Sequence, residues 1–453
     1  MTRARSAGGR ARCAAAVAFA LSLSGCGPGE GEKRGTPAAP APPAAEVPAA
    51  GAASAKAAAG AAPATPADLP RGLALALAQF VEREGKSVPG AARAEFLYRE
   101  GGVWKTASLE DPESNVFHKV MPYAGPDGPR LLTLAGSAAA VKAWAPVDGK
   151  LQPTTLWQQD FGGKFSRMRD AEVADVMGDG KAAIAVATHD QGVVAVLEPP
   201  AAAGGAFTAL ELDREANTFV HEVEVGDLDG DGVLEIYATP SEPNRLDGAP
   251  QSGKVVRYVP KKKEGRVVVA DLGTRHAKEI LVADLDGDGR DELLVSVEGT
   301  TGPDGKQLVE PVELRLYRAD TPATGGTRIA TLPDRLSRFL TLGDIDGDGR
   351  KELVAAAFSS GVWLLRPGAT PDAEWTREVI DADSAGFEHA ALLTDLDGDG
   401  RDELYVASDK HKEVRRYVWD GQRLVRETIY RRPDARPIFT WNLMPVPVEL
   451  IPR

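Results

Sequence analysis

Short apolar runs separated by turn-forming residues make up most of the chain. From about residue 94 onward these runs are rich in Val, Ile, Leu and aromatic residues, and Gly, Asp and Pro lie between them. This pattern is typical of β-strands joined by tight turns. One earlier segment differs, because Leu73, Leu77, Phe80 and Val81 have roughly helical spacing. We therefore expect one short helix within residues 70–84 and strands after it.

The strand pattern repeats around an acidic loop. The motif Asp-x-Asp-Gly-Asp-Gly-x-x-Glu begins at Asp227, Asp284, Asp344 and Asp395, and a degenerate copy begins at Asp175. Successive copies start between 51 and 60 residues apart. Within each unit one apolar run precedes the loop and three follow it. Four strands in about 50 residues are typical of one blade of a β-propeller.

Two weaker copies, starting at Tyr123 and Trp441, bring the number of units to seven. The last unit has room for only two strands before the chain stops. The residues after Phe96 resemble those after Arg416, which are the third and fourth strands of the sixth unit. We therefore expect an all-β fold, a seven-bladed β-propeller that closes between its N- and C-terminal strands. In this scheme two strands from each end complete the last blade, and no exposed edge remains.

The N-terminus has the features of an export signal. Four arginines (Arg3, Arg5, Arg10 and Arg12) precede an apolar stretch over residues 14–23. The sequence Leu-Ser-Gly-Cys that ends at Cys26 resembles the lipobox of bacterial lipoproteins, with Cys26 as the lipidated residue. The expected division is a lipoprotein signal peptide (1–25), an Ala/Pro/Gly-rich disordered tether (26–69), a short helix and linker (70–93) and the propeller (94–453).

Charge and cysteine content narrow the possible partners. The net charge of −13 argues against nucleic acid as a partner. The only two cysteines are Cys13 and Cys26, so the repeat region can hold neither a disulfide nor a Cys-ligated metal. Stabilisation of the folded state by a bound cation is an alternative open to an exported protein without disulfides.

The repeats resemble those of FG-GAP/VCBS proteins, with the seven-bladed architecture of integrin α-subunit heads. The resemblance covers roughly residues 94–453, and its motif is full in four units, partial in one and nearly erased in two. An EF-hand is excluded because the loops lack flanking helices and a Glu at position 12. An unrelated seven-fold propeller with acidic turns is the alternative.

The acidic loops carry the donors that Ca²⁺ prefers. Carboxylates at positions 1, 3, 5 and 9 and the carbonyl at position 7 supply oxygen ligands, while the glycines at positions 4 and 6 allow a sharp turn. We expect about four Ca²⁺ ions, and a weaker fifth site at Asp175 and Asp179. The predicted ligands are Asp227, Asp229, Asp231, Val233 and Glu235; Asp284, Asp286, Asp288, Arg290 and Glu292; Asp344, Asp346, Asp348, Arg350 and Glu352; and Asp395, Asp397, Asp399, Arg401 and Glu403.

A second repeated feature lies six residues before each loop. Five successive units place a basic residue or a histidine there: Arg169, His221, Lys278, Arg338 and His389. At the start of the first strand these residues would surround the channel entrance on the face opposite the acidic loops. They either form a rim that binds an anionic or polar ligand, or cap strand ends and pair with nearby acids such as Glu222 and Glu388.

The sequence contains no recognisable catalytic motif, so we expect a protein without enzymatic activity. The favoured interpretation is a calcium-stabilised binding or adhesion module of the bacterial cell envelope, whose ligand is an unknown glycan or protein. The predicted form is a monomer held at the membrane by its N-terminal lipid, at the outer membrane or cell surface. The alternative is a carbohydrate-active or other extracellular enzyme that uses the face opposite the calcium loops. A purely structural envelope component is a third possibility.

Overall fold

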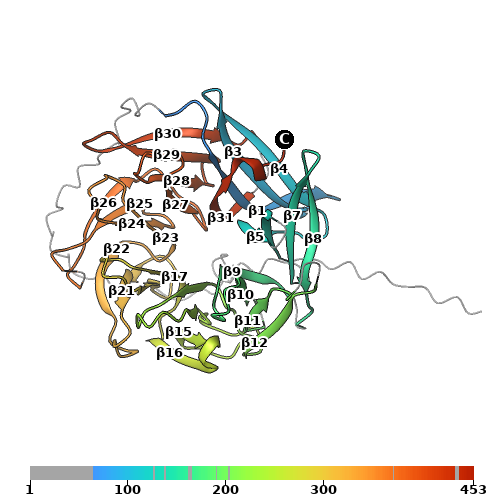
Figure 1. Ribbon diagram of the computed structural model, residues 1–453. Coiled ribbons are helices and arrows are strands. Elements are labelled where there is room, and N and C mark those ends of the chain that lie inside the picture. The colour runs from blue at the N-terminus through green and yellow to red at the C-terminus, as the bar shows by residue number, and fades with distance from the viewer. Residues whose placement is uncertain are drawn as a thin grey trace, which may run out of the picture.

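Seven antiparallel sheets are arranged around a central axis (Figure 1). The computed structural model describes residues 65–125, 128–136, 139–161, 166–189, 191–201, 205–370, 372–433 and 438–453. The predicted signal peptide, Cys26 and nearly all of the predicted tether lie outside the described residues. The prediction of an all-β, seven-bladed propeller is confirmed.

Six blades consist of consecutive strands, which follow one another from the axis outward. Blade 1 contains β5 (Phe117–Gly125), β6 (Gly128–Ala135), β7 (Ala140–Val147) and β8 (Lys150–Gln158). Blade 2 contains β9 (Met168–Ala174), β10 (Ala183–Thr188), β11 (Val193–Glu198) and β12 (Thr208–Arg214). Blade 3 contains β13 (Val223–Gly226), β14 (Glu235–Ala238), β15 (Gly253–Val259) and β16 (Glu264–Gly273), with the 3₁₀ turn η1 (Pro260–Lys262) between the last two.

Blade 4 contains β17 (Ala277–Ala283), β18 (Glu292–Val297), β21 (Val312–Tyr317) and β22 (Thr327–Leu332), and a small hairpin of β19 (Thr300–Thr301) and β20 (Leu308–Glu310) is inserted in it. Blade 5 contains β23 (Ser337–Gly343), β24 (Glu352–Ala357), β25 (Val362–Arg366) and β26 (Thr376–Asp381). Blade 6 contains β27 (Ala391–Thr394), β28 (Glu403–Ser408), β29 (Glu413–Trp419) and β30 (Leu424–Arg431).

Blade 7 joins the two ends of the chain. Its innermost strand is β31 (Ile438–Pro447), which pairs with β1 (Arg71–Arg83), and β3 (Ala92–Glu100) and β4 (Val103–Asp111) follow outward. The short strand β2 (Lys86–Pro89) pairs with the end of β1, and the 3₁₀ turn η2 (Val448–Leu450) follows β31. The expected closure is confirmed, but its division was wrong: three strands come from the N-terminus and one from the C-terminus.

The predicted helix within residues 70–84 is the strand β1. Leucines and alanines alternate from Leu73 to Ala78, and this period of two presents a different set of side chains to each neighbouring blade. Leu73, Leu75 and Leu77 pack with blade 6, whereas the intervening alanines pack with blade 1. Leu and Ala both favour helices in isolation, so their tertiary environment overrides their intrinsic preference. Residues 71–89 thus belong to blade 7 and are not a helix and linker.

The core lies between the blades. The second strands β10, β24 and β28 are buried along their whole length, because each is covered on both faces by adjacent blades. Their runs of Val, Ala and Leu suit the narrow space near the axis. The outermost strands such as β12 and β26 are largely polar and partly exposed. The innermost strands β13, β17, β23 and β27 each run from one end of the channel toward a full acidic loop at the other, so the ring has two distinct faces.

Candidate functional site

The four full acidic loops bring their aspartates together. In the Asp227, Asp344 and Asp395 loops, oxygens of the aspartates at positions 1, 3 and 5 lie within 4.8 Å of one another. In the Asp284 loop the converging group is Asp284, Asp286 and Glu292. The first aspartate also organises each loop, since Asp284 Oδ1 accepts the backbone N–H of Gly287 at 2.7 Å and Oδ2 that of Gly289 at 3.1 Å. Clustered carboxylates with no nitrogen or sulfur donor suit a hard cation.

The glutamate at position 9 is buried in every full loop. Each accepts the backbone N–H of position 2, as Glu235 Oε2 does from Leu228 at 3.2 Å. An arginine from the third strand or just after it pairs with this glutamate in three loops: Arg257 with Glu235 at 3.0 Å, Arg318 with Glu292, and Arg416 with Glu403 at 2.8 Å. Burial raises the pKa of Glu292, Glu352 and Glu403 to about 7. This arginine is a partner that the sequence pattern did not reveal.

The degenerate loop at Asp175 lacks such a converging group among the described residues. Asp175 accepts the backbone N–H groups of Asp179 and Gly180, and Asp179 pairs with Lys181 at 3.3 Å. A cation at this loop, like the ligand sets of the four full loops, stays a prediction.

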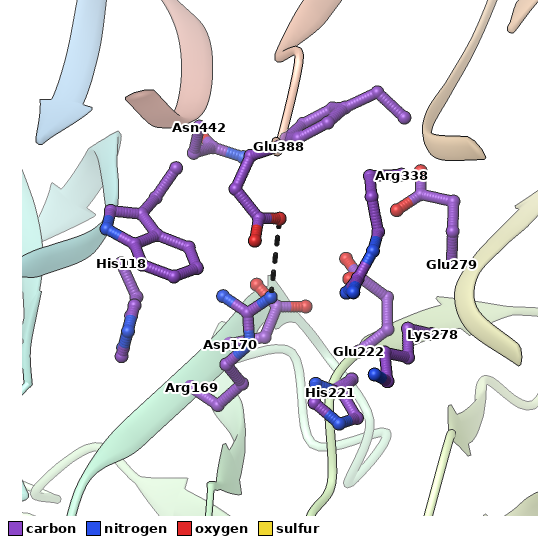
Figure 2. A pocket seen from close by; sticks show the side chains of 12 residues that line it. His118, Arg169, Asp170, His221, Glu222, Lys278, Glu279, Arg338, Glu388 and Asn442 are labelled. Atoms are coloured by element: carbon purple, nitrogen blue, oxygen red, sulfur yellow. Dashed lines mark ion pairs between the residues drawn. The ribbon is translucent and has the colours of Figure 1, made fainter. Parts of the chain in front are cut away.

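The opposite end of the channel holds a cluster of charged and aromatic side chains contributed by several blades (Figure 2). We call it the mouth cluster. The cavity volume there is about 20 Å³, enough for a single water molecule. Its members are His118, Arg169, Asp170, His221, Glu222, Lys278, Glu279, Arg338, Phe339, Glu388, Trp441 and Asn442.

The mouth cluster is held in place by irregular strand pairing. The register between the innermost and second strands skips one residue at Arg169, Lys278, Arg338 and Trp441. A similar irregularity falls between Phe117 and Val120, the stretch that contains His118. A β-bulge leaves one residue out of the ladder and changes the direction of its side chain, and bulges are common beside active sites. Five of seven innermost strands thus deviate from regular pairing at the level of the mouth.

The structure brings four of the five predicted rim residues together: Arg169, His221, Lys278 and Arg338 all line the mouth. His389 does not, because its side chain is fully buried and bonds the Ser384 hydroxyl and the Ala357 carbonyl, each at 2.7 Å. The preceding residue, Glu388, lines the mouth instead.

The basic rim residues also have acidic partners, as the alternative interpretation expected. Glu242 bonds both His221 at 3.0 Å and Lys278 at 2.7 Å, and Arg169 lies 3.9 Å from Glu388. Arg169 further stacks over the Trp441 ring at 5.0 Å, and Arg338 lies 3.9 Å from Glu298.

Several buried polar atoms of the mouth cluster have no partner among the described residues. They are His221 Nδ1, Arg338 Nε, Trp441 Nε1 and Asn442 Oδ1. Because His221 Nε2 donates to Glu242, the Nδ1 atom of the neutral ring is left as an acceptor. Buried polar groups without a hydrogen bond cost free energy in the folded state. A ligand that forms hydrogen bonds with these groups would recover that free energy on binding.

Burial shifts the pKa values of two members of the mouth cluster, His221 and Glu222. Burial, and then Lys278 and Arg169, hold the pKa of His221 well below its usual range. Burial, and then Asp170 and Glu279, raise the pKa of Glu222 well above its usual range. Among the described residues the Glu222 carboxyl group receives no hydrogen bond and forms no ion pair. The mouth therefore combines a histidine whose neutral form is favoured with a glutamate whose protonated form is favoured.

Eight members of the mouth cluster were not predicted as rim residues. Four of them directly follow a rim position: Asp170, Glu222, Glu279 and Phe339. Three of these four are acids, and this recurrence in the sequence could have indicated that they line the mouth. His118 and Glu388 lie outside that spacing. Trp441 had been aligned with the first aspartate of a loop, but it lies inside β31 at the opposite end of the channel.

Comparisons with known proteins agree with the repeat pattern. Residues 344–406 match the family model of the FG-GAP-like repeat. Integrin alpha pat-2 of Caenorhabditis briggsae is 24% identical over 216 residues, which cover 41% of this chain and 17% of that protein. The rhamnogalacturonan exolyase YesX of Bacillus subtilis (strain 168) is 24% identical over 231 residues, 41% of this chain and 37% of that enzyme. The chain thus spans well under half the length of each of these relatives.

Two solved structures resemble the chain over most of its length. The periplasmic gluconolactonase PpgL of Pseudomonas aeruginosa has a TM-score of 0.47 at 14% identity, covering 82% of this chain and 99% of that one. A Bacteroides fragilis protein described as a candidate 6-phosphogluconolactonase has a TM-score of 0.48 at 16% identity, covering 83% and 98%. Likeness at these scores carries no argument about activity.

The prediction that the chain is not an enzyme is contradicted by the curated relatives, because they include an exolyase. The absence of a catalytic sequence motif was a poor guide, since a propeller assembles its channel mouth from residues of several blades. Among the described residues no helix is long and apolar enough to cross a bilayer. The matched repeat, the integrin relatives and the seven blades together support an FG-GAP β-propeller.

Proposed function

We propose that the protein is an exported, calcium-stabilised propeller that acts as a carbohydrate-active enzyme, with its active site at the mouth cluster. The observation that carries the proposal is the set of irregular inner strands, which turn charged and aromatic side chains of several blades toward one point. A structural channel would not require unpaired donors and acceptors there. Glu222, whose protonated form is favoured by burial, is the proposed general acid, and His221, oriented by Glu242, is the proposed general base.

The substrate class follows from the shape and charge of the mouth. A cavity that holds one water cannot enclose a sugar ring, so the chain of sugars would lie across the mouth and one polar group or water would enter. Arg169, Lys278 and Arg338 favour a substrate that carries carboxylates. The similarity to a rhamnogalacturonan exolyase also supports an acidic polysaccharide.

The activity test compares two glutamates of neighbouring position. The calcium-loaded protein is incubated with a panel of neutral and acidic polysaccharides, and new chain ends are measured. Glu222→Gln should reduce the rate about 100-fold or more, as expected for loss of a general acid. Glu224→Gln is the matched control, because Glu224 lies two residues further on, in the inner strand β13 and outside the mouth cluster, and should leave the rate unchanged. Binding of a polysaccharide with no turnover would contradict the proposed enzyme.

We further propose that the four full loops hold Ca²⁺. The converging aspartate oxygens and the all-oxygen donor set support this cation, which bound there would neutralise the crowded carboxylates. Calcium at ten times its Kd would stabilise the protein by about 1.4 kcal/mol per loop. The melting temperature should therefore rise with millimolar Ca²⁺ and fall on chelation. Magnesium at the same concentration is the control, and an equal melting temperature in chelator and in Ca²⁺ would contradict the proposal.

Export and membrane attachment also belong to the proposal. The arginine-rich start, the apolar stretch and Cys26 support a lipid anchor at the cell envelope. Radioactive palmitate should label the wild type in a bacterial host and should not label Cys26→Ser. Equal labelling of both proteins would contradict this assignment.

A further inference from the structure

The residue at position 8 of two acidic loops reaches back to the loop before it. Asp291 Oδ2 accepts the backbone N–H of Asp227 at 2.7 Å, and the Asp291 N–H donates to the Asp227 carbonyl at 3.2 Å. Asp402 makes the same two bonds to Asp344, both at 2.9 Å. We call this pair of hydrogen bonds a clasp. In each case the clasped residue is the first aspartate of the neighbouring loop, and its carboxylate accepts backbone hydrogen bonds that hold that loop in shape.

A glycine accompanies each clasp. Gly226 and Gly343 precede the two clasped aspartates, and a Cβ at Gly226 would lie 2.2 Å from Val282 Cγ1 and 2.7 Å from Asp291 Oδ2. A Cβ at Gly343 would meet the Asp402 carboxylate in the same way. The equivalent residues before the other two full loops are Ala283 and Thr394. The glycine is therefore present where an aspartate clasps from the next blade and absent where none does.

The arginine at position 7 strengthens the same grouping. Arg290 packs against Gly230 and Arg401 against Gly347, so the next loop covers the position-4 glycine of each clasped loop. The corresponding Gly287 and Gly398 of the other loops have open space where a Cβ would be.

The boundary between the Asp284 and Asp344 loops is built differently. Position 8 is Lys351, which makes a single bond from Nζ to the Asp284 carbonyl at 2.9 Å. Arg350 turns instead to the carbonyls of its own blade at Pro367 and Gly368.

We propose that the four loops form two coupled pairs, one of the Asp227 and Asp284 loops and one of the Asp344 and Asp395 loops, and that cation binding is positively cooperative within each pair. The proposal rests on calcium binding by these loops as proposed above. A cation held by the position-7 carbonyl and the position-9 glutamate of one loop would fix the clasping aspartate that lies between them. That aspartate then orders the first ligand of the partner loop, so binding of the second ion costs less ordering entropy.

The test isolates one pair within the full chain. Asp344→Asn and Asp395→Asn together remove the second pair, and calcium binding to the remaining two loops is measured by isothermal titration calorimetry. The expected titration is cooperative, with a Hill coefficient above 1. Adding Asp291→Ala should remove the cooperativity and raise the calcium concentration at half-saturation about fivefold, which is the lower end of common coupling strengths.

Asp291→Asn is the matched control, because its side-chain oxygen still accepts the Asp227 N–H and should preserve cooperativity. Lys351→Ala alters the boundary between pairs and should preserve it too. Melting in chelator checks that each variant is folded before titration. The same titration curve for Asp291→Ala and Asp291→Asn, or independent sites in the background protein, would overturn the coupling. No heat of binding and no calcium-dependent melting in the wild type would instead overturn the calcium proposal on which it rests.

Discussion

One face of the propeller carries the acidic loops and the other carries the mouth cluster, and we call them the acidic-loop face and the mouth face. The two faces differ in which features recur from blade to blade. On the acidic-loop face the residues repeat and the geometry repeats with them, so that the buried glutamates and the first aspartates make the same backbone bonds in loop after loop. On the mouth face the irregular pairing recurs, but the residue at that position varies between Arg, Lys and Trp: Arg169, Lys278, Arg338 and Trp441. Repeated side chains suit a repeated structural task. Different side chains on a repeated backbone feature suit recognition of one asymmetric ligand.

The largest expected change in stability comes from a buried charge on the inner strand β5, between the two faces. Lys119 is buried beside Asp170 at 3.1 Å and also pairs with Glu172. Although burial opposes it, these acids raise the pKa of Lys119 well above its usual range. Lys119→Met would leave two uncompensated carboxylates and should cost about 3–5 kcal/mol in the free energy of unfolding. Urea unfolding measures it. Lys105→Met, which removes an exposed pair with Glu100, should leave the unfolding curve unchanged.

A smaller effect is expected on the acidic-loop face, where the clasp leaves no room for a side chain. Gly343→Ala should destabilise the protein by about 1–3 kcal/mol, because the new methyl group displaces the Asp402 carboxylate. Thr394→Ala, at the equivalent position before the Asp395 loop, adds no atom and displaces no carboxylate, so it should destabilise the protein less than Gly343→Ala. Equal values for the two variants in thermal or urea unfolding would show that the clasp imposes no steric demand.

The smallest effect concerns the pH dependence of the mouth face. Burial, followed by Arg167 and His221, holds the pKa of His189 well below its usual range. The unfolded chain therefore binds more protons than the folded one below about pH 6.5, and stability falls as the solution is acidified, by up to about 1.4 kcal/mol per pH unit for this group. His189→Asn keeps an acceptor for Arg167. Its melting temperature should fall less between about pH 7 and pH 5.5 than that of the wild type, and an equal fall would contradict the assignment.

The sequence was sufficient to predict the ring, because its strongest signals are local. The turn chemistry of the Asp227, Asp284, Asp344 and Asp395 loops depends on residues within nine positions of one another. The rim positions Arg169, Lys278 and Arg338 could be found because they keep a constant offset from those loops. Their bulges could not, since a bulge shows only against its paired strand.

The failures lie where the nearest neighbours are distant in sequence. Residues 71–83 look helical by composition, but their partners are β31 and β3, so tertiary pairing decides their conformation. Trp441 was predicted to start a weak copy of the acidic loop. That prediction fails because the seventh unit has lost its loop and because β31 contains a bulge. The clasps of Asp291 and Asp402 join adjacent repeats, and only the structure shows that the glycine before one loop makes room for an aspartate from the next.

The pairing of β31 with β1 has a consequence for biogenesis. Strand β1 is made early, yet the partner for its inner edge is β31, more than 350 residues later. Until Pro447 has been synthesised, the Leu and Ala backbone of β1 presents unsatisfied hydrogen-bonding groups, the kind of edge that promotes aggregation. The nascent chain therefore cannot complete its ring in vectorial order, and a chaperone that holds the early strands apart would act on this one edge.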